Sequence, residues 1–151
     1  MYFVDREKIE KILSYMETIQ AEVRKQGFST FREKLVLERL THLIVEAVLD
    51  VGNMMIDGFI MRDPGSYDDI IDILLDEKVL PAEHEEAFKQ FIQLRKMIVH
   101  EYTEVDHESV ERAWTTYQQA LEAFPERIRM YLDHELGPVS AFSKTTTKGE
   151  D

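Results

Sequence analysis

The stretch LVLERLTHLIVEAVLDVGNMMI, residues 35–56, determines the fold of this 151-residue chain. Its apolar side chains cover more than one stripe of a helix, and they are Leu35, Leu37, Leu40, Leu43, Ile44, Ala47, Val48, Val51, Met54 and Met55. A helix that is apolar on more than one side has to bury more than one side. We therefore expect a helix at the centre of a bundle, or one that also carries a partner interface.

A row of polar side chains interrupts this apolar helix. His42, Glu46, Asp50 and Asn53 follow one another at steps of four, four and three residues, which places them on one helical face. We call this row the polar seam. It is either the one solvated face of the helix, or a set of groups that support a functional site on a neighbouring helix.

The sequence before this stretch predicts how the chain enters it. Thr30 and Glu33 have the spacing of a capping box, so the central helix should begin there. Upstream, we expect an amphipathic helix over about residues 5–26, because apolar residues recur there at three- and four-residue steps. Asp5 is its expected N-cap and Gly27 its expected stop.

The sequence after this stretch predicts three more helices. RDPGS, residues 62–66, breaks the helical pattern and indicates a loop. The expected helices are a short one over Tyr67–Asp76, one from Pro81 to residue 102, and one that starts near Asp106. Pro125 should kink the last helix or begin a new segment.

The helical pattern extends over the whole folded part of the chain. No segment alternates apolar and polar residues with the period of a strand. Five helices joined by short connections are typical of an all-α, up-and-down helical bundle. We expect this bundle to occupy residues 1–136, and residues 137–151 to form a disordered C-terminal tail.

The composition excludes several classes of function. The chain has no cysteine, which excludes disulfide scaffolds, thiolate zinc sites and cysteine nucleophiles. It has no start resembling a signal peptide and no run of about 18 apolar residues that would cross a membrane, so we expect a cytoplasmic protein. The formal net charge of −12 repels phosphate backbones at long range and disfavours general affinity for nucleic acids.

Arg95 breaks the pattern of the helix that ends near residue 102. That helix has an apolar stripe made of Phe88, Phe91, Ile92, Ile98, Val99 and Tyr102, and Arg95 falls on the same stripe. A guanidinium group stays protonated, so burying it without a partner is very costly. Arg95 must therefore meet a carboxylate, a cleft or a ligand.

His100 follows five residues after Arg95, about 140° around an ideal helix. Two interpretations are open. In the first, Arg95 is a buried residue paired with carboxylates of the central helix, and His100 lies at the surface. In the second, Glu46 and Asp50 pair with Arg95 and orient His100, so that the polar seam supports a site.

The segment LRKMIVHEY, residues 94–102, resembles the signature of the HepT-like branch of the HEPN superfamily. That signature is Arg, four residues, His, one residue and Tyr at the end of a helix, here Arg95, His100 and Tyr102. The long helix with LIVEAVLDVGNMMI, the short helix after it and the Val105–Asp106 start of the next one are also similar to that family. The resemblance covers about residues 5–135 and implies a HEPN-like helical bundle.

The resemblance also implies a function. It implies a homodimer whose two motifs face one shared cleft, acting as a metal-independent endoribonuclease without a cofactor. His100 would be the general acid or base, and Arg95 would stabilise the transition state. Such family members are toxins paired with a small nucleotidyltransferase antitoxin of the MntA type, which transfers AMP to the motif tyrosine, here Tyr102.

Lys96 departs from the family pattern, in which Asn usually follows the Arg. In that place Lys96 would keep a contact to the substrate phosphate and lose an orienting role. The alternative interpretation is therefore a catalytically inactive helical partner of a nucleotidyltransferase, which the net charge also favours. A third alternative is a metal site, since Glu104 and His107 have Glu-x-x-His spacing, although a di-iron bundle needs this motif twice.

Overall fold

The computed structural model of the chain describes residues 3–25 and 27–137, which form helices joined by short connections. These helices are α1 (Arg6–Lys25), α2 (Phe31–Gly58), α3 (Tyr67–Asp76), the 3₁₀ turn η1 (Ala82–His84), α4 (Glu85–His100), α5 (His107–Thr116) and α6 (Gln118–Leu136). The described residues contain no strand, so the all-α prediction is confirmed. The predicted tail lies outside the described residues, apart from Gly137.

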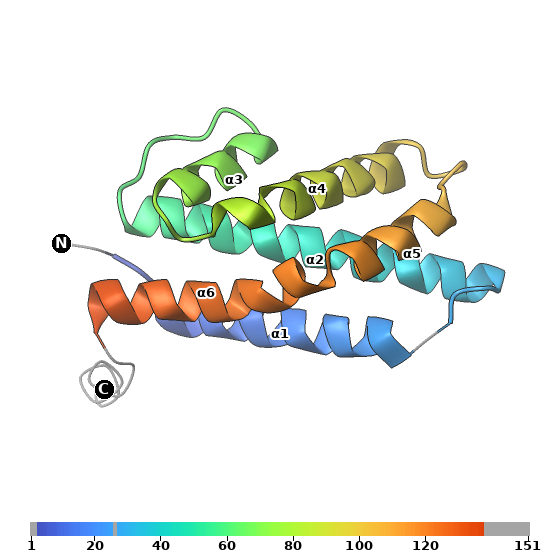
Figure 1. Cartoon of the computed structure of the whole chain (residues 1–151), viewed down its shortest axis with the longest axis horizontal. Coiled ribbons are helices and arrows are strands. Elements are labelled where there is room, and N and C mark those ends of the chain that lie inside the picture. The colour runs from blue at the N-terminus through green and yellow to red at the C-terminus, as the bar shows by residue number, and fades with distance from the viewer. Residues whose placement is uncertain (1–2, 26, 138–151) are drawn as a thin grey trace.

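α2 lies at the centre of the bundle (Figure 1). It packs against α1, α3, α4 and α5, while α6 lies beside α1 on one flank and α3 lies beside α4 on the other. The chain direction alternates from α1 to α2 to α4 to the α5–α6 pair, as in an up-and-down bundle. Leu37, Ile44 and Val51 of α2 are fully buried. The prediction that this stretch forms the central helix is therefore confirmed.

The first two helices begin with the expected capping bonds. The Glu33 amide donates to Thr30 Oγ1 at 3.1 Å, and the Thr30 amide donates to Glu33 Oε1 at 3.0 Å, so the capping box is complete. At the start of α1, the Lys8 amide donates to Asp5 Oδ1 at 3.0 Å. These bonds satisfy amide groups that a helix leaves without partners at its N-terminus. Local sequence thus sets where α1 and α2 begin.

Gly52 allows α2 and α3 to approach closely. A Cβ atom at this position would lie 2.6 Å from Ile70 Cγ2 and 3.4 Å from Leu74 Cδ1. The first separation is far shorter than an ordinary van der Waals contact between carbon atoms. The glycine therefore lets α3 lie against α2, and α3 begins with Tyr67, which belongs to the site described below.

The last helical segment breaks at a different place from the predicted one. The break falls at Tyr117, between α5 and α6, so the described residues form six α-helices instead of five. Pro125 lies inside α6. A proline has no amide hydrogen, and it leaves the carbonyl four residues before it, here that of Leu121, without a helical donor. The buried side chain of Gln20 on α1 donates to that carbonyl at 2.9 Å, which allows α6 to continue through Pro125.

The fourth helix differs from the prediction at both ends. Pro81 precedes the turn η1 and does not belong to the first turn of α4, which begins at Glu85. At the other end, Glu101 leaves the helical backbone region with φ −115° and ψ 47°, so α4 ends at His100. Tyr102 therefore lies in the turn after α4 and not on its apolar stripe, and it is 71% exposed.

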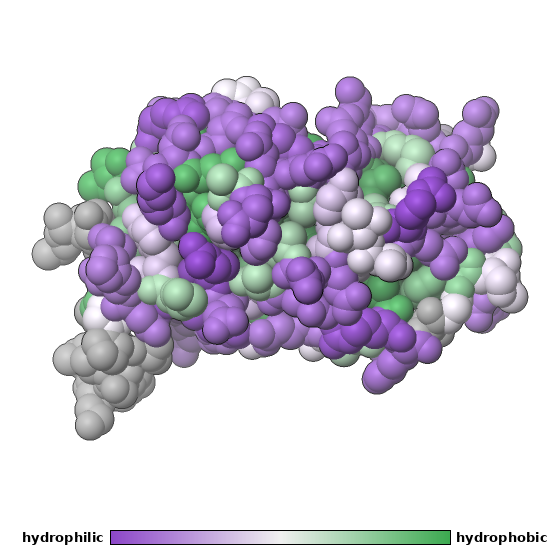
Figure 2. Space-filling view, viewed as in Figure 1, coloured by the Kyte–Doolittle hydropathy of each residue, from purple (hydrophilic) through white to green (hydrophobic). Residues whose placement is uncertain are grey.

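One face of the molecule is mainly hydrophilic. The face of the molecule seen in Figure 2 is dominated by polar and charged residues, with small apolar patches between them. This agrees with the composition, in which 30 Asp and Glu residues stand against 18 Lys and Arg residues. Within the described ranges, none of the helices combines the length and the apolar character that crossing a membrane would require.

Candidate functional site

Arg95 lies between α2, α3 and α4. Its Nε donates to Glu46 Oε2 of α2 at 2.6 Å, and its Cζ lies 5.1 Å from the centroid of the Tyr67 ring at the start of α3. The Arg95 side chain is only 18% exposed. A carboxylate and an aromatic face together stabilise a cation that is largely removed from water. The predicted pairing of Arg95 with a carboxylate of the central helix is therefore present for Glu46.

The geometry of this bond leaves the far end of the guanidinium group available for other contacts. Glu46 is bound through Nε, so the two terminal nitrogens, Nη1 and Nη2, lie outside that bond. These two atoms form the planar fork with which arginine binds carboxylates and phosphates through paired hydrogen bonds. Arg95 is thus held from one side in an orientation that suits an anionic ligand on the other.

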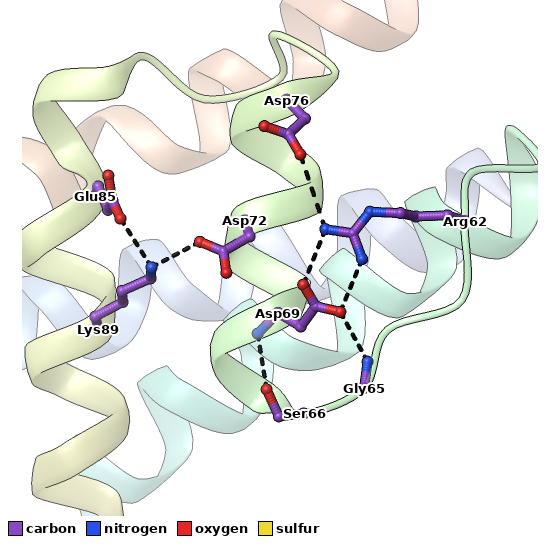
Figure 3. A network of polar contacts seen from close by, with 8 residues as sticks. All are labelled: Arg62, Gly65, Ser66, Asp69, Asp72, Asp76, Glu85 and Lys89. Atoms are coloured by element: carbon purple, nitrogen blue, oxygen red, sulfur yellow. Dashed lines mark hydrogen bonds and ion pairs between the residues drawn. The ribbon is translucent and has the colours of Figure 1, made fainter.

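A polar network holds the loop that precedes Tyr67 (Figure 3). Arg62 donates through Nη1 and Nη2 to both carboxylate oxygens of Asp69, at 2.8 and 2.9 Å. The same carboxylate accepts a bond from the Gly65 amide at 2.8 Å, and the Asp69 amide donates to Ser66 Oγ at 3.1 Å. The Arg62 guanidinium group, followed by the Gly65 amide, holds the pKa of Asp69 below its usual range. The chain immediately before Tyr67 is therefore tied down at several points.

A second part of this network ties α3 to α4. Lys89 of α4 donates to Asp72 of α3 at 2.6 Å and to Glu85 of its own helix at 2.8 Å (Figure 3). The hydrogen bond to Asp72, followed by that to Glu85, raises the pKa of Lys89 well above its usual value. Lys89 and Arg95 lie on the same helix, so the bonds of Lys89 help to set how α3 sits relative to Arg95.

The other members of the polar seam have different environments. His42 Nε2 lies 3.7 Å from Glu46 Oε2, the same oxygen that binds Arg95. Asp50 and Asn53 are exposed on α2. The structure therefore brings Glu46 and His42 to Arg95 and leaves the rest of the seam in contact with solvent.

The remaining residues of the predicted motif lie at the surface of the single chain. His100 is the last residue of α4 and is exposed, as are Lys96 and Tyr102. Among the described residues, Glu46 forms its hydrogen bond to another helix with Arg95 and not with His100. One chain by itself thus presents a held Arg95 and an exposed His100, as in the first of the two interpretations of the sequence.

Within the described part of the chain, His107 is hydrogen-bonded to one carboxylate and does not belong to a cluster that could bind a metal. Its Nε2 lies 2.6 Å from Glu38 Oε2 of α2. Glu104 is exposed and precedes α5, which begins at His107, so the two residues of the Glu-x-x-His spacing do not share a helix. Among the described residues, no three His, Cys, Asp or Glu side chains are grouped as a metal site would require.

Comparison with known proteins identifies the family. The family model described as ribonuclease HepT-like matches residues 6–128, which is most of the chain. The protein belongs to the HepT-like family. The resemblance found in the residues around Arg95 and His100 is therefore confirmed at the level of the family.

One relative, matched both in sequence and in structure, illustrates this family relationship. The chain is 51% identical over 143 residues to a Bacillus subtilis protein named "Putative RNase YutE", covering 94% of this chain and 99% of that protein. The solved structure of YutE, described as a cytosolic protein of unknown function, matches with a TM-score of 0.90 over 94% of this chain and 100% of that one.

A more distant structure has the same fold. It is described as the crystal structure of a toxin–antitoxin with AMP-PNP. Its TM-score is 0.65 and its sequence identity 17%, and the match covers 81% of this chain and 92% of that one. At this level of identity the likeness concerns the arrangement of helices.

Proposed function

We propose that the protein is a metal-independent endoribonuclease of the toxin type, which acts in the cytoplasm without a cofactor. The observation that supports this most directly is the environment of Arg95. Its guanidinium group is held by Glu46 and lies over Tyr67, while Nη1 and Nη2 stay outside the bond to Glu46. Membership of a ribonuclease family supports the same function.

The proposed chemistry assigns a role to each motif residue. Cleaving RNA without a metal needs a group that moves protons near neutral pH, together with fixed positive charge beside the phosphorus atom. His100 moves the proton, since imidazole is the side chain best suited to this near neutrality. Arg95 stabilises the charge that develops on the phosphate oxygens, and Lys96, one residue further, contacts the substrate phosphate.

A second copy of the chain completes the proposed site. In one chain, His100 lies about 140° around α4 from Arg95, so a cleft formed by two copies is the simplest way to surround one phosphate with both groups. Phe31 and Leu35 of α2 are 78% and 46% exposed, and Leu35 precedes His42 by two helical turns on the same helix. Exposed apolar side chains beside a polar site are suited to such an interface.

The polar seam supports this cleft from α2. Glu46 orients Arg95, and Asp50 and Asn53 continue the same face of the helix toward its C-terminal half. The formal charge of −12 makes general binding of RNA weak. Recognition of RNA is therefore confined to the cleft, where Arg95 and Lys96 supply local positive charge.

We further propose that a nucleotidyltransferase antitoxin of the MntA type is the partner, and that it transfers AMP to Tyr102. Tyr102 is well exposed in the turn that follows His100, so its hydroxyl group is accessible to another protein. An adenylate group so near His100 would block the approach of RNA. The structural likeness to a toxin–antitoxin complex with AMP-PNP is in keeping with this proposal.

A second candidate function is a catalytically inactive partner of a nucleotidyltransferase. Two observations favour it: Lys96 replaces the Asn that usually follows the Arg of the motif, and the chain is strongly acidic. This candidate predicts a stable complex with the transferase, and AMP on Tyr102, without cleavage of RNA.

One experiment distinguishes the two candidates. Purified protein, first weighed by mass spectrometry so that adenylated Tyr102 is recognised, is incubated with labelled single-stranded RNA and EDTA beside Arg95→Ala and His100→Ala. The ribonuclease predicts cleavage by the unmodified wild type, products with 2′,3′-cyclic phosphate ends, and loss of both in each variant. Inert unmodified protein, or full activity in His100→Ala, would overturn the ribonuclease proposal.

A further inference from the structure

We propose that His42 on α2 is the general acid of the cleavage reaction and protonates the leaving 5′-oxygen. His100 is then the general base, which takes the proton of the 2′-hydroxyl group. This inference rests on the proposed ribonuclease function and adds a second proton-transfer group to it, from a helix that does not carry the Arg-His-Tyr motif.

His42 and Arg95 share one carboxylate oxygen. Glu46 Oε2 accepts a 2.6 Å bond from Arg95 Nε and lies 3.7 Å from His42 Nε2. The His42 side chain is 28% exposed, so it is held by its surroundings and still accessible to a ligand. The group proposed to stabilise the phosphate and the group proposed to protonate its leaving oxygen therefore lie near the same carboxylate oxygen, which is hydrogen-bonded to Arg95 and within ion-pair distance of His42.

The helix register places His42 level with His100. α2 and α4 pack together and run in opposite directions (Figure 1), and the bond between Glu46 and Arg95 fixes how they are aligned. His100 lies five residues after Arg95, about 7.5 Å along α4, and His42 lies four residues before Glu46, about 6 Å along α2 in the same direction. Both imidazoles thus lie beyond the bond between Arg95 and Glu46, toward the same end of the molecule.

The cleavage step requires two proton transfers. The base removes the proton of the 2′-hydroxyl, and the 2′-oxygen attacks phosphorus and forms a new P–O bond. The bond from phosphorus to the 5′-oxygen breaks, and this oxygen takes a proton from the acid. The products are a 2′,3′-cyclic phosphate and a 5′-hydroxyl. The base is left protonated and the acid deprotonated, and exchange with water restores both.

The contact with Glu46 favours the role of acid over that of base for His42. The 3.7 Å contact is an ion pair when His42 is protonated, and an acid must be protonated when the substrate binds. His100, at the exposed end of α4, has no such recorded carboxylate contact in the described residues and suits the base. An arginine cannot supply this proton, because its guanidinium group does not deprotonate in proteins.

Two carboxylates flank His42 on its own helix. On α2, Glu38 and Glu46 lie one turn to either side, at i−4 and i+4. Glu38 binds His107 of α5 at 2.6 Å, and Glu46 binds Arg95 of α4. Both carboxylates already have a cationic or imidazole partner from another helix. Among these three side chains of α2, His42 is the one that forms no hydrogen bond to another helix in the described residues, so its imidazole remains available to a ligand.

The test compares the cleavage rates of two substrates that have different leaving groups, both measured in the presence of EDTA. One is a short RNA, whose leaving 5′-oxygen needs a proton, and the other is uridine 3′-(4-nitrophenyl phosphate), whose leaving nitrophenolate does not. The proteins are the wild type, His42→Gln, His100→Gln and, as a control, His134→Gln on an exposed position of α6. The ratio of the two rates within one sample does not depend on how much of that sample is folded.

The general-acid role predicts a selective loss. His42→Gln should cleave RNA about 10²–10⁴-fold more slowly than the wild type, and the nitrophenyl ester within about tenfold of it. The alkaline limb of its pH–rate profile on RNA should also disappear. His100→Gln should lose cleavage of both substrates, and His134→Gln should lose cleavage of neither.

Two other results would overturn the proposal in distinguishable ways. In the first, the wild type cleaves both substrates, and His42→Gln slows the two cleavage rates equally or slows neither. This result keeps the ribonuclease function and removes His42 as the acid. In that case a group such as a second copy's His100 protonates the leaving oxygen. No cleavage of either substrate by unmodified wild type removes the ribonuclease function, and the role of His42 with it.

Discussion

Gln20 donates a 2.9 Å hydrogen bond to the carbonyl oxygen of Leu121, the group that Pro125 leaves without a helical donor. Gln20 and Leu121 are both buried between α1 and α6. We expect Gln20→Leu to lower the free energy of unfolding by about 1–3 kcal/mol, because the carbonyl would remain buried without a donor. Unfolding in urea, followed by circular dichroism, measures this loss.

The same substitution in a Pro125→Ala background tests the cause. Alanine at position 125 supplies an amide hydrogen in the right place for the Leu121 carbonyl. Gln20→Leu should therefore cost less in that background, with a coupling free energy of about 1 kcal/mol. Equal losses in both backgrounds would show that the side chain of Gln20 stabilises the bundle in some other way.

Glu46 holds Arg95 and should matter for both stability and activity. Glu46→Gln should lower the free energy of unfolding by about 1 kcal/mol at most, because the Glu46 side chain is partly exposed and solvent screens the pair. Its effect on RNA cleavage should be larger, since a neutral amide binds the guanidinium group more weakly than a carboxylate and orients Arg95 less firmly. The matched control is Asp57→Asn, an exposed position on the same helix. The prediction fails if the two variants cleave RNA at the same rate.

Local chemistry made much of the fold predictable. Two features of the fold depend only on residues close together in sequence, and both predictions are confirmed. They are the capping box of Thr30 and Glu33 and the wide apolar surface of residues 35–56. The break at Tyr117 was not predictable in this way. Pro125 is a strong local signal for a break, and it is overridden by a tertiary bond from Gln20, about a hundred residues away in sequence.

The candidate site was predictable only in part. Arg95 was identified because a charged residue on an apolar stripe needs a partner, and Glu46 was one of the two carboxylates expected to supply it. Tyr67 was missed, since its place under Arg95 depends on how α3 packs on α2 and α4 and on the loop bonds of Asp69. The exposed position of Tyr102 was missed because α4 ends earlier than its apolar pattern.

Acid should weaken the contact between α1 and α6. The hydrogen bond from Arg129 is the main cause that lowers the pKa of Glu10 from its ordinary value of 4.5. A carboxyl group whose pKa is lower in the folded than in the unfolded state stabilises the fold above the unfolded pKa, and this contribution disappears as pH falls through the folded pKa. The melting temperatures of the wild type and Glu10→Gln should therefore differ most near neutral pH and converge below about pH 4.

The control for this pH effect is Glu126→Gln, which changes an exposed carboxylate of α6. Thermal unfolding of all three proteins is followed across the acid range at constant ionic strength. Because the bonds of Arg129 reach both Glu10 and Glu17 of α1, Glu10→Gln should weaken and not abolish the connection. A difference between the wild type and Glu10→Gln that grows as the pH falls has the wrong sign for this mechanism.

Leu35 tests whether a second copy covers the α2 face. It is a large apolar side chain, 46% exposed in the single chain and two turns before His42. If two copies meet on this face, Leu35→Glu places a charge in the interface of an already acidic protein, and the two copies repel each other. We expect this variant to elute as a monomer in chromatography with light-scattering detection and to lose RNA cleavage. The single chain should stay folded and keep its melting temperature.

Met130→Glu, at an exposed position on α6, is the matched control and should keep both the dimer and its activity. A wild type that is a monomer at every concentration and cleaves RNA, or a Leu35→Glu monomer that still cleaves RNA, would mean that a single chain contains the whole site and that His100 reaches the substrate of its own Arg95.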